Sequence, residues 1–260
     1  MTPGILLGGI LIFVAAWTGW KLKALTVTGA LASIGIGIMT LVGTGVNGLL
    51  LLGAFFASSS LWSKFKAKSK SAMDEKLAKG ATRDWRQVAA NGGPAAICSG
   101  MFFATGNPIW LTCYAAAISS ANSDTWASEI GPIGKRDPIS IKGFKRAERG
   151  TSGAVSLLGT CAALAGAGFI AIMAVYFFGL PLWTGWIIFI FGFLGNVIDT
   201  LLGAYFQVSY KCKVCGLETE KARHCGVPTG KVKGNSLLDN DVVNFLSGAA
   251  AVMGTYLILL

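Results

Sequence analysis

Residues 24–63 are ALTVTGALASIGIGIMTLVGTGVNGLLLLGAFFASSSLWS, 40 residues without one charged side chain. A membrane-spanning helix needs about 20 apolar residues, so this run has room for two spans. Gly43–Gly48, at its centre, is rich in the Gly and Asn that form turns. Four further uncharged runs cover residues 1–20, 87–123, 150–198 and 242–260. Their lengths predict one, two, two and one more spans, which makes eight in all.

The composition agrees with this prediction. Hydrophobic residues make up 53% of the 260 residues and charged residues only 13%, about half of the roughly 25% that soluble proteins carry. We therefore exclude a soluble fold and predict an all-α polytopic membrane protein, with residues 1–260 as a single domain. Residues 1–63 form scaffold helices, and residues 64–260 carry the polar groups. The predicted spans are 4–20, 24–42, 46–63, 85–104, 109–127, 152–178, 182–207 and 240–260.

The basic residues predict the orientation of these spans. All 22 Lys and Arg residues lie in four segments, 21–23, 64–86, 135–149 and 211–233. With eight spans these segments share one side, which the positive-inside rule makes cytoplasmic. Both termini then lie outside, together with short uncharged turns at 43–48, 105–108 and 179–181. The net charge of +10 is thus explained by topology, and it indicates a lipid bilayer as partner instead of nucleic acid.

Two aspartates stand out among the acidic residues. Asp124 and Asp199 each lie near the cytoplasmic, C-terminal end of a predicted span. A carboxylate there faces the negative end of the helix dipole and is partly buried, and both effects disfavour it. Two interpretations remain open: a shared cation, most simply Mg²⁺, or pairing with arginines from the loops.

Polar neighbours of these aspartates favour the metal interpretation. Asn196 and Asp199 share one helical face, as do Asp124 and Ser128. Hard oxygen ligands of this kind suit Mg²⁺ that is held together with substrate phosphates. The candidate Mg²⁺ ligands are Asp124, Glu129, Asp199 and Asp241. The candidate substrate ligands at the same depth are Asn91, Asn122, Ser128, Asn196, Asn240 and Asn244. Asp84 and Asp239 begin helices, so simple N-caps are the alternative for them.

Residues 149–153, Arg-Gly-Thr-Ser-Gly, supply candidate phosphate donors. We predict that they form the N-terminus of the sixth span, where exposed N–H groups and the helix dipole favour an anion. Lys142 adds positive charge upstream. The candidate phosphate-binding residues are therefore Lys142, Arg149, Gly150, Thr151, Ser152 and Gly153. An ordinary capped loop–helix junction is the alternative. The chain has no P-loop motif, so a P-loop nucleotide site is excluded.

These motifs resemble those of a known family. Residues 122–131, NSDTWASEIG, are similar to the Asp-x-x-Ala-x-x-x-Gly signature of CTP-dependent polyprenol kinases, to which CDP-diacylglycerol synthases are more distantly related. Over nearly its full length the chain more closely resembles the integral-membrane family that contains plant phytyl-phosphate kinase. The segments that carry this resemblance are 83–88, 91–93, 123–129, 149–153, 196–200 and 240–244.

The resemblance implies an enzyme that phosphorylates an isoprenyl monophosphate to its diphosphate, with a nucleoside triphosphate, expected to be CTP, as donor. It implies that Asp124 and Asp199 hold Mg²⁺ and that Arg149 and residues 150–153 bind phosphates. A CTP-dependent lipid kinase or a cytidylyltransferase acting on another lipid is the first alternative. A transporter is the second alternative. Its polar residues would be expected near mid-membrane and on both sides, whereas those of this chain gather at one face. The sequence leaves the oligomeric state undetermined.

The N-terminal residues indicate where the protein resides. The first span follows the initial methionine without a basic stretch or a cleavage pattern, so we expect it to be retained. Plastid-targeted members of the family carry an N-terminal extension that this chain lacks. We therefore expect a multi-pass protein of a prokaryotic plasma membrane.

A Cys/His motif lies in the predicted cytoplasmic loop 208–235. Its residues are Cys212, Cys215, His224 and Cys225. The Cys-x-x-Cys spacing followed by a His/Cys pair suits a structural tetrahedral Zn²⁺, and a redox-active or simply reduced dithiol is the alternative. His224 is the only histidine, which excludes a Ser-His-Asp hydrolase.

Overall fold

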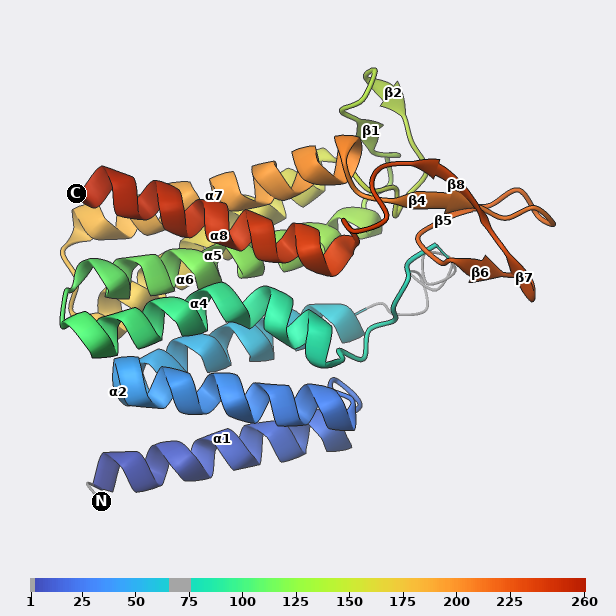
Figure 1. Ribbon diagram of the computed structural model, residues 1–260. Helices are drawn as coiled ribbons and strands as arrows, with labels where there is room; N and C mark the ends of the chain where they lie inside the picture. Colours follow the sequence, from blue (N-terminus) through green and yellow to red (C-terminus); the bar gives the residue numbers. More distant parts are fainter. Residues whose placement is uncertain (1–2, 66–75) are drawn as a thin grey trace.

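The computed structural model describes residues 3–65 and 76–260, and its long helices form one bundle (Figure 1). The ends of the helices agree with the predicted spans to within a few residues, except that the sixth starts five residues later than 152. Residues 66–75 of the predicted basic loop lie outside the described residues. The helices are α1 Pro3–Lys21, α2 Val27–Lys64, α4 Trp85–Thr105, α5 Ile109–Ile130, α6 Leu157–Phe178, α7 Leu182–Tyr205 and α8 Asn240–Leu259.

Helix α2 turns back on itself at Gly45, where φ is +69° and ψ is −161°. Its two halves correspond to the predicted spans 24–42 and 46–63, and they run side by side in opposite directions (Figure 1). Leu25, just before the first half, and Phe56, in the second, both approach Gly19, where a Cβ would lie 2.8 Å from Leu25 Cδ1 and 3.0 Å from Phe56 Cζ. Only glycine adopts a φ of +69° readily, which explains why α2 turns at Gly45.

The chain is a multi-pass membrane protein by the length and apolarity of its helices. Among the described residues, α1, α2, α6, α7 and α8 are long and apolar enough to cross a bilayer. Helices α4 and α5 fall below that hydropathy because they are rich in small and polar residues. The count of eight spans and their orientation therefore stay predictions.

The interior of the bundle is rich in small and polar side chains, with a few large ones such as Tyr114 and Ile118, whereas many large apolar side chains lie on its outer surface. Helix α5 contacts α2, α4, α6, α7 and α8, and every residue of Thr112–Ser123 is buried. Leu31, Leu182 and Trp186 on outer helices are 65%, 77% and 66% exposed. In a bilayer, close packing through Ala, Gly and Ser brings helices together while large apolar side chains face the lipid. This arrangement explains why α5 is central despite its low hydropathy.

The prediction of an all-α fold misses short antiparallel strands in two loops. They form sheets in the order β2-β1-β3 and β5-β4-β8 and a separate β6-β7 pair. The strands are β1 Ile139–Ser140, β2 Lys145–Arg146, β3 Ala154–Val155, β4 Ser209–Lys211, β5 Glu218–Thr219, β6 Arg223–His224, β7 Val227–Pro228 and β8 Gly230–Lys233. A short 3₁₀ helix, Gly131–Ile133, follows α5.

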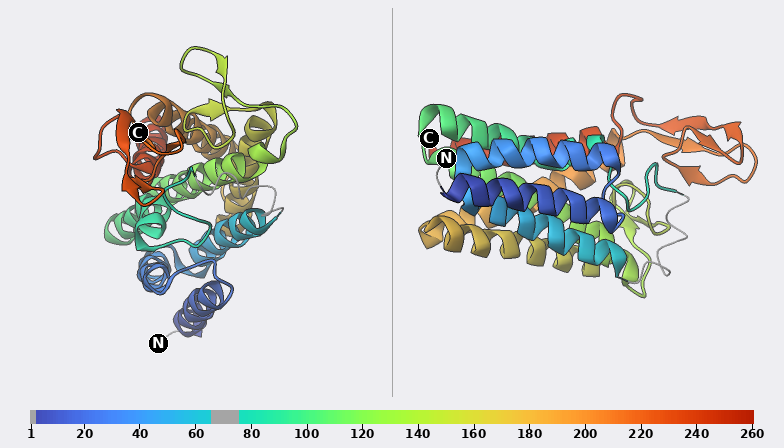
Figure 2. Two further views of the ribbon diagram at one scale, coloured as in Figure 1. Left: turned by 90° about the vertical axis from the view of Figure 1, so that its right-hand side faces the viewer. Right: turned by 90° about the horizontal axis from the view of Figure 1, so that it is seen from below.

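These strands all lie at one end of the bundle, which we call the loop end (Figures 1 and 2). The beginning of α1 and the end of α8 lie at the opposite end. Helices α5 and α7 therefore finish at the loop end, and α4 and α8 start there. Asp124 and Asp199, near the ends of α5 and α7, are consequently on the same side of the molecule as the first turns of α4 and α8.

Candidate functional site

A cavity of about 400 Å³ opens at the loop end between α4, α5, α7 and α8 and the adjoining loops. Its volume is within the range of sites for small molecules and cofactors. The structure brings most of the predicted site residues to its wall, although they come from five separate segments of sequence. Those that line it are Asn91, Asp124, Ser128, Glu129, Arg149, Gly150, Thr151, Ser152, Gly153, Asn196, Asp199, Asn240, Asp241 and Asn244.

The wall between Asp124 and Asp199 is built by a close contact of α5 with α7. A Cβ on Gly195 would lie 2.1 Å from Ser120 Oγ, and one on Gly192 would lie 1.9 Å from Ser119 Oγ. Such distances leave no room for a side chain, so both positions require glycine. One turn further along, both helices reach the cavity, and Asn196 Nδ2 donates a hydrogen bond to Asp124 Oδ1 at 3.1 Å.

Neither carboxylate of this pair has a cationic partner in the part of the chain that the structure describes. Within residues 3–65 and 76–260, no lysine or arginine forms an ion pair with Asp124 or Asp199. Asp199 Oδ2 accepts one hydrogen bond, from Ser247 Oγ at 3.2 Å. The alternative of pairing with loop arginines is thus absent from the described part of the chain. Two carboxylates and an amide at one wall are a donor set that fits a hard divalent cation such as Mg²⁺.

The acidic residues at the starts of α4 and α8 are arranged differently. Lys79 Nζ lies 2.8 Å from Asp84 Oδ2 and 2.5 Å from Asp241 Oδ2. Arg86 Nη2 lies 2.6 Å from Asp239 Oδ2. These carboxylates already have basic partners, which weakens the predicted role of Asp241 as a metal ligand.

Asp84 and Asp239 also act as N-caps, as the alternative interpretation proposed. Asp84 accepts a hydrogen bond from Gln87 N, and Gln87 Oε1 accepts one from Asp84 N, which makes a complete capping box. Asp239 Oδ1 accepts from Val242 N at 3.1 Å. Near Asp84, Lys79 holds the pKa of the carboxyl below its ordinary value although burial opposes this effect.

Residues 149–153 line the cavity, but the prediction that they begin the sixth helix is wrong. Helix α6 starts at Leu157, and its N-cap is Ser156, whose Oγ accepts from Gly159 N. Gly150 and Gly153 instead have φ of +78° in a turn before β3. Gly153 packs directly on α7, where a Cβ would lie 2.4 Å from Ala204 Cα. The turn is therefore fixed by its contact with the end of α7.

The guanidinium of Arg149 is occupied by the neighbouring loop. Its Nη1 and Nη2 donate to Pro132 O at 3.2 Å and to Lys135 O at 3.3 Å, and its Nε is 3.8 Å from Asp137 Oδ1. These contacts tie Arg149 to the neighbouring loop while it lines the cavity, and its catalytic role stays a prediction. Glu129 lines the cavity and accepts a hydrogen bond from Ser63 Oγ at 2.6 Å.

Two predicted substrate ligands do not line the cavity. Asn122 is fully buried between helices, where its Nδ2 donates to Gly166 O at 2.8 Å and its Oδ1 accepts from Ser58 Oγ at 3.1 Å. It satisfies its own polar groups within the bundle, so the predicted substrate role is not supported. Lys142 lies in the loop between β1 and β2 and does not reach the cavity wall.

Arg83 lines the cavity and was missed by the sequence analysis. Its Nη1 donates to Ser60 Oγ at 3.1 Å, and among the described residues no carboxylate forms an ion pair with it. A cation in this position is suited to an anionic ligand. Its only sequence signal was its place in the Arg-Asp-Trp-Arg-Gln motif, because nothing in a basic loop distinguishes one arginine from its neighbours.

Gln207 and Glu220 were also missed, and both line the cavity from the loop after α7. Gln207 Nε2 donates to Glu220 Oε1 at 2.7 Å, while Gln207 Oε1 accepts from Ser152 Oγ at 2.8 Å. Burial raises the pKa of Glu220 above its ordinary value of 4.5. The Cys/His residues of this loop gather separately and do not line the cavity.

Comparisons with known proteins agree with the membrane fold. Protein PGR of Arabidopsis thaliana is 30% identical over 268 residues, covering 89% of this chain and 88% of that protein. Uncharacterized membrane protein MJ0933 of Methanocaldococcus jannaschii is 32% identical over 205 residues, covering 76% of this chain and 81% of its own length. Protein VTE6, chloroplastic, of Arabidopsis thaliana is 25% identical over 203 residues, covering 76% of this chain and 61% of that protein.

No solved structure matches the chain. The family described as integral membrane protein DUF92 matches residues 10–252, which include every helix in whole or in part. The chain therefore belongs to the DUF92 family of integral membrane proteins.

Proposed function

We propose that the chain is a membrane-embedded isoprenyl-phosphate kinase. It transfers the terminal phosphoryl group of a nucleoside triphosphate, expected to be CTP, to a prenyl or phytyl monophosphate. An oxygen of the acceptor phosphate forms a new bond to the γ-phosphorus, the bond from that phosphorus to the β–γ bridging oxygen breaks, and the nucleoside diphosphate leaves. The motif resemblance to the family of plant phytyl-phosphate kinase supports the substrate class.

The observation that carries this proposal is a pair of carboxylates at one cavity wall that form no ion pair with any described lysine or arginine. Asp124 from α5 and Asp199 from α7 would hold Mg²⁺, with Asn196 orienting Asp124 through its hydrogen bond. Mg²⁺, when bound, neutralises charge on the β- and γ-phosphates. The chain's own contribution is to hold these two carboxylates side by side through the tight packing of α5 on α7.

Cationic groups on the other walls suit the phosphates of the two substrates. Arg83 forms no ion pair among the described residues. Besides its hydrogen bond to Ser60 and an electrostatic interaction with Glu129, its guanidinium has further N–H donors that suit a phosphate. The turn at residues 150–153 lines the cavity, and Gly150, which carries no side chain, allows an anion to approach the backbone there. The acceptor is itself an anion, so the reaction needs positioning and charge neutralisation more than a strong base.

The position of the cavity suits a lipid acceptor. It lies at one end of an apolar bundle, so a hydrocarbon tail remains among the helices or the lipids while its phosphate reaches the cavity. By the positive-inside rule this end is cytoplasmic, where nucleoside triphosphates are available. The basic loops that flank the cavity attract anionic head groups as well.

The test is an assay of the purified full-length protein in detergent or lipid nanodiscs. Phytyl and geranylgeranyl monophosphate are each incubated with Mg²⁺ and CTP, ATP, UTP or GTP, and products are identified by mass spectrometry. The proposal expects a prenyl diphosphate and a nucleoside diphosphate. Release of pyrophosphate with a CDP-linked lipid would identify a cytidylyltransferase instead. Absence of any product with every pair, from protein shown to be folded, would contradict the proposal.

A further inference from the structure

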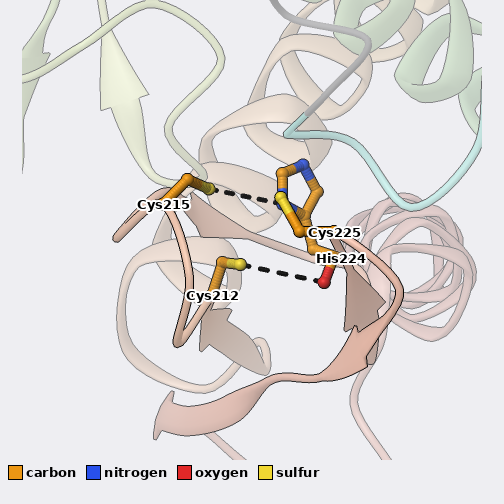
Figure 3. Close-up of side chains that lie close together, drawn as sticks. All are labelled: Cys212, Cys215, His224 and Cys225. Atoms are coloured by element: carbon orange, nitrogen blue, oxygen red, sulfur yellow. Dashed lines mark hydrogen bonds between the residues drawn. The ribbon is translucent and has the colours of Figure 1, made fainter.

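The loop between α7 and α8 brings four potential metal ligands to one point (Figure 3). Cys212 and Cys215 come from the turn after β4, and His224 and Cys225 come from the end of β6 and the turn that follows. One ligand atom from each of these residues lies within 4.8 Å of all the others. This cluster is separate from the cavity and has no part in the proposed kinase reaction.

The backbone around Cys212 forms a tight knuckle that presents its sulfur. Val214 N donates to Cys212 Sγ at 3.4 Å, and Gly216 N donates to Cys212 O at 3.0 Å. Gly216 has φ of +75°, a conformation that glycine adopts without steric cost. Backbone N–H groups that point at a sulfur stabilise a thiolate, which is the form that ligates a metal.

The turn at His224 and Cys225 directs the side chains of these two adjacent residues toward the same point. Cys225 has φ of +51°, one of three non-glycine residues with positive φ in the described chain, and Gly226 follows with φ of +76°. This turn places Cys225 Sγ 3.2 Å from His224 Nδ1. Cys215 Sγ lies 3.4 Å from the same nitrogen. Backbone strain at a non-glycine residue persists where its surroundings favour it.

These two separations, 3.2 and 3.4 Å, are slightly shorter than the edges of a tetrahedron around zinc, and all pairs of ligand atoms lie within 4.8 Å. Ligands bound at about 2.1 Å for nitrogen and 2.3 Å for sulfur lie roughly 3.5–3.8 Å apart in tetrahedral geometry. We propose that Cys212, Cys215, His224 through Nδ1, and Cys225 bind one structural Zn²⁺. The ligand set is Cys₃His, a common structural zinc site, and all four positions are filled by protein.

The surrounding structure explains why this loop needs a metal. Its strands β4 to β8 are two to four residues long, and segments of this size bury too little apolar surface to be stable alone. A disulfide would use two of the three thiols and leave the histidine and the third cysteine without a role. Zinc accounts for all four residues, and its binding free energy stabilises the fold of the loop directly.

The loop in turn supports a wall of the cavity. Glu220 N and Thr219 Oγ1 both donate to Lys76 O at 2.8 Å, and Glu220 accepts from Gln207. A zinc ion bound by His224, four residues after Glu220, therefore holds in place the segment that contains Glu220 and its partner Gln207. Loss of the ion is expected to loosen this wall without touching Asp124 or Asp199.

The test measures metal in the purified full-length protein, expressed without added zinc, by inductively coupled plasma mass spectrometry. We expect about one zinc per chain, as a closed four-ligand site requires. The double variant Cys212→Ser, Cys215→Ser should lose it, whereas the matched control Cys161→Ser, an exposed cysteine on α6, should keep it. Equal zinc in the wild type and the double variant would overturn the proposal.

A second measurement does not depend on the folding of a variant. Wild-type protein expressed in cobalt-supplemented minimal medium should show the intense thiolate-to-cobalt charge-transfer absorption and the visible bands of a tetrahedral site. Folded wild-type protein that contains neither zinc nor cobalt, or a Cys212–Cys215 disulfide found by peptide mass spectrometry of freshly purified protein, would overturn the proposal. Metal content is measured independently of kinase activity, so the two proposals can fail separately.

Discussion

The aspartates at the helix ends around the cavity fall into two groups. At the ends of α5 and α7, Asp124 and Asp199 have hydrogen bonds to neutral side chains and no ion pair in the described chain. At the starts of α4 and α8, Asp84, Asp239 and Asp241 bond to Lys79 and Arg86. Asp124, Asp199, Asp239 and Asp241 all line the same cavity, so access to the cavity does not distinguish the two groups.

The helix dipole sharpens this difference. Asp84, Asp239 and Asp241 lie at helix N-termini, where the dipole favours a negative charge, and they also have cations beside them. Asp124 and Asp199 lie near C-termini, where the dipole opposes it. A structural role explains the first group fully. The second group is costly unless a ligand provides the missing positive charge, which is why we assign function to it.

The largest predicted effect is on catalysis by the α5–α7 pair. Asp199→Asn keeps the size of the side chain but removes the charge that Mg²⁺ requires, and we expect phosphoryl transfer to fall by about 100-fold or more, equivalent to several kcal/mol of lost transition-state stabilisation. Asp124→Asn should behave alike. The double variant should be little worse than either single variant, because residues that act as a unit are not additive. Diphosphate formation is the measurement.

The matched control is Asp239→Asn at the start of α8. Asparagine is as good an N-cap as aspartate, so turnover should stay near that of the wild type. Near-normal turnover by Asp199→Asn would refute the role assigned to it. Loss of folded protein together with activity, seen in detergent thermal melts, would indicate a structural carboxylate instead.

The second prediction concerns Arg83. Arg83→Lys retains the charge but not the planar pair of donors, and we expect KM for the phosphorylated substrates to rise roughly 10-fold or more, since hydrogen bonds to charged groups are worth about 1.5–3 kcal/mol. Arg86→Lys is the control, because Arg86 already pairs with Asp239 and is not needed for phosphate. An unchanged KM for both substrates in Arg83→Lys would show that Arg83 does not bind their phosphates.

The third prediction concerns Lys79, which pairs with two of the aspartates at the starts of α4 and α8. Lys79→Met removes the cation shared by Asp84 and Asp241, which should lower stability by about 1 kcal/mol or less because the ammonium is partly exposed and Arg86 stays nearby. Thermal melts in detergent measure this. Turnover should fall far less than in Asp199→Asn. A hundredfold loss of turnover in folded Lys79→Met would mean that the comparison between the two groups is wrong.

The smallest predicted effect is on the pH dependence of stability. The pKa of Glu220 is raised in the folded protein, so the folded state retains its proton over a window that begins near 4.5 and extends upward. Stability therefore falls as pH rises through that window. Glu220→Gln cannot ionise and keeps an acceptor for Gln207, so its melting temperature should decline less with rising pH than that of the wild type.

Glu148 provides a control of opposite sign. A hydrogen bond from Lys76 lowers the pKa of Glu148, so its stabilising effect is present above the ordinary value of 4.5 and is lost as pH falls. Glu148→Gln should therefore reduce stability slightly at neutral pH and not in acid. A Glu220→Gln curve parallel to the wild-type curve would show that Glu220 has no raised pKa.

The helices could be predicted from the sequence because long uncharged runs have few structural options in a bilayer. The sequence also indicated that polar residues from α4, α5, α7 and α8 share one depth. It did not indicate that Gly150–Gly153 form a turn instead of a helix start, because that depends on contact with Ala204 of α7. Arg83, Gln207 and Glu220 were missed for the same reason: tertiary contacts, not local patterns, bring them to the cavity.

Gly192 and Gly195 have a consequence for how this architecture can diversify. They fix the spacing of α5 and α7 inside the bundle, so the separation of Asp124 and Asp199 is independent of the loops above them. Insertions or exchanges in the β1–β3 and β4–β8 segments can then change the outline of the cavity without moving the two carboxylates. Under the proposed kinase function, acceptor preference and phosphoryl transfer would therefore be separable traits, the first set by the loops and the second by the contact that two glycines of α7 make with α5.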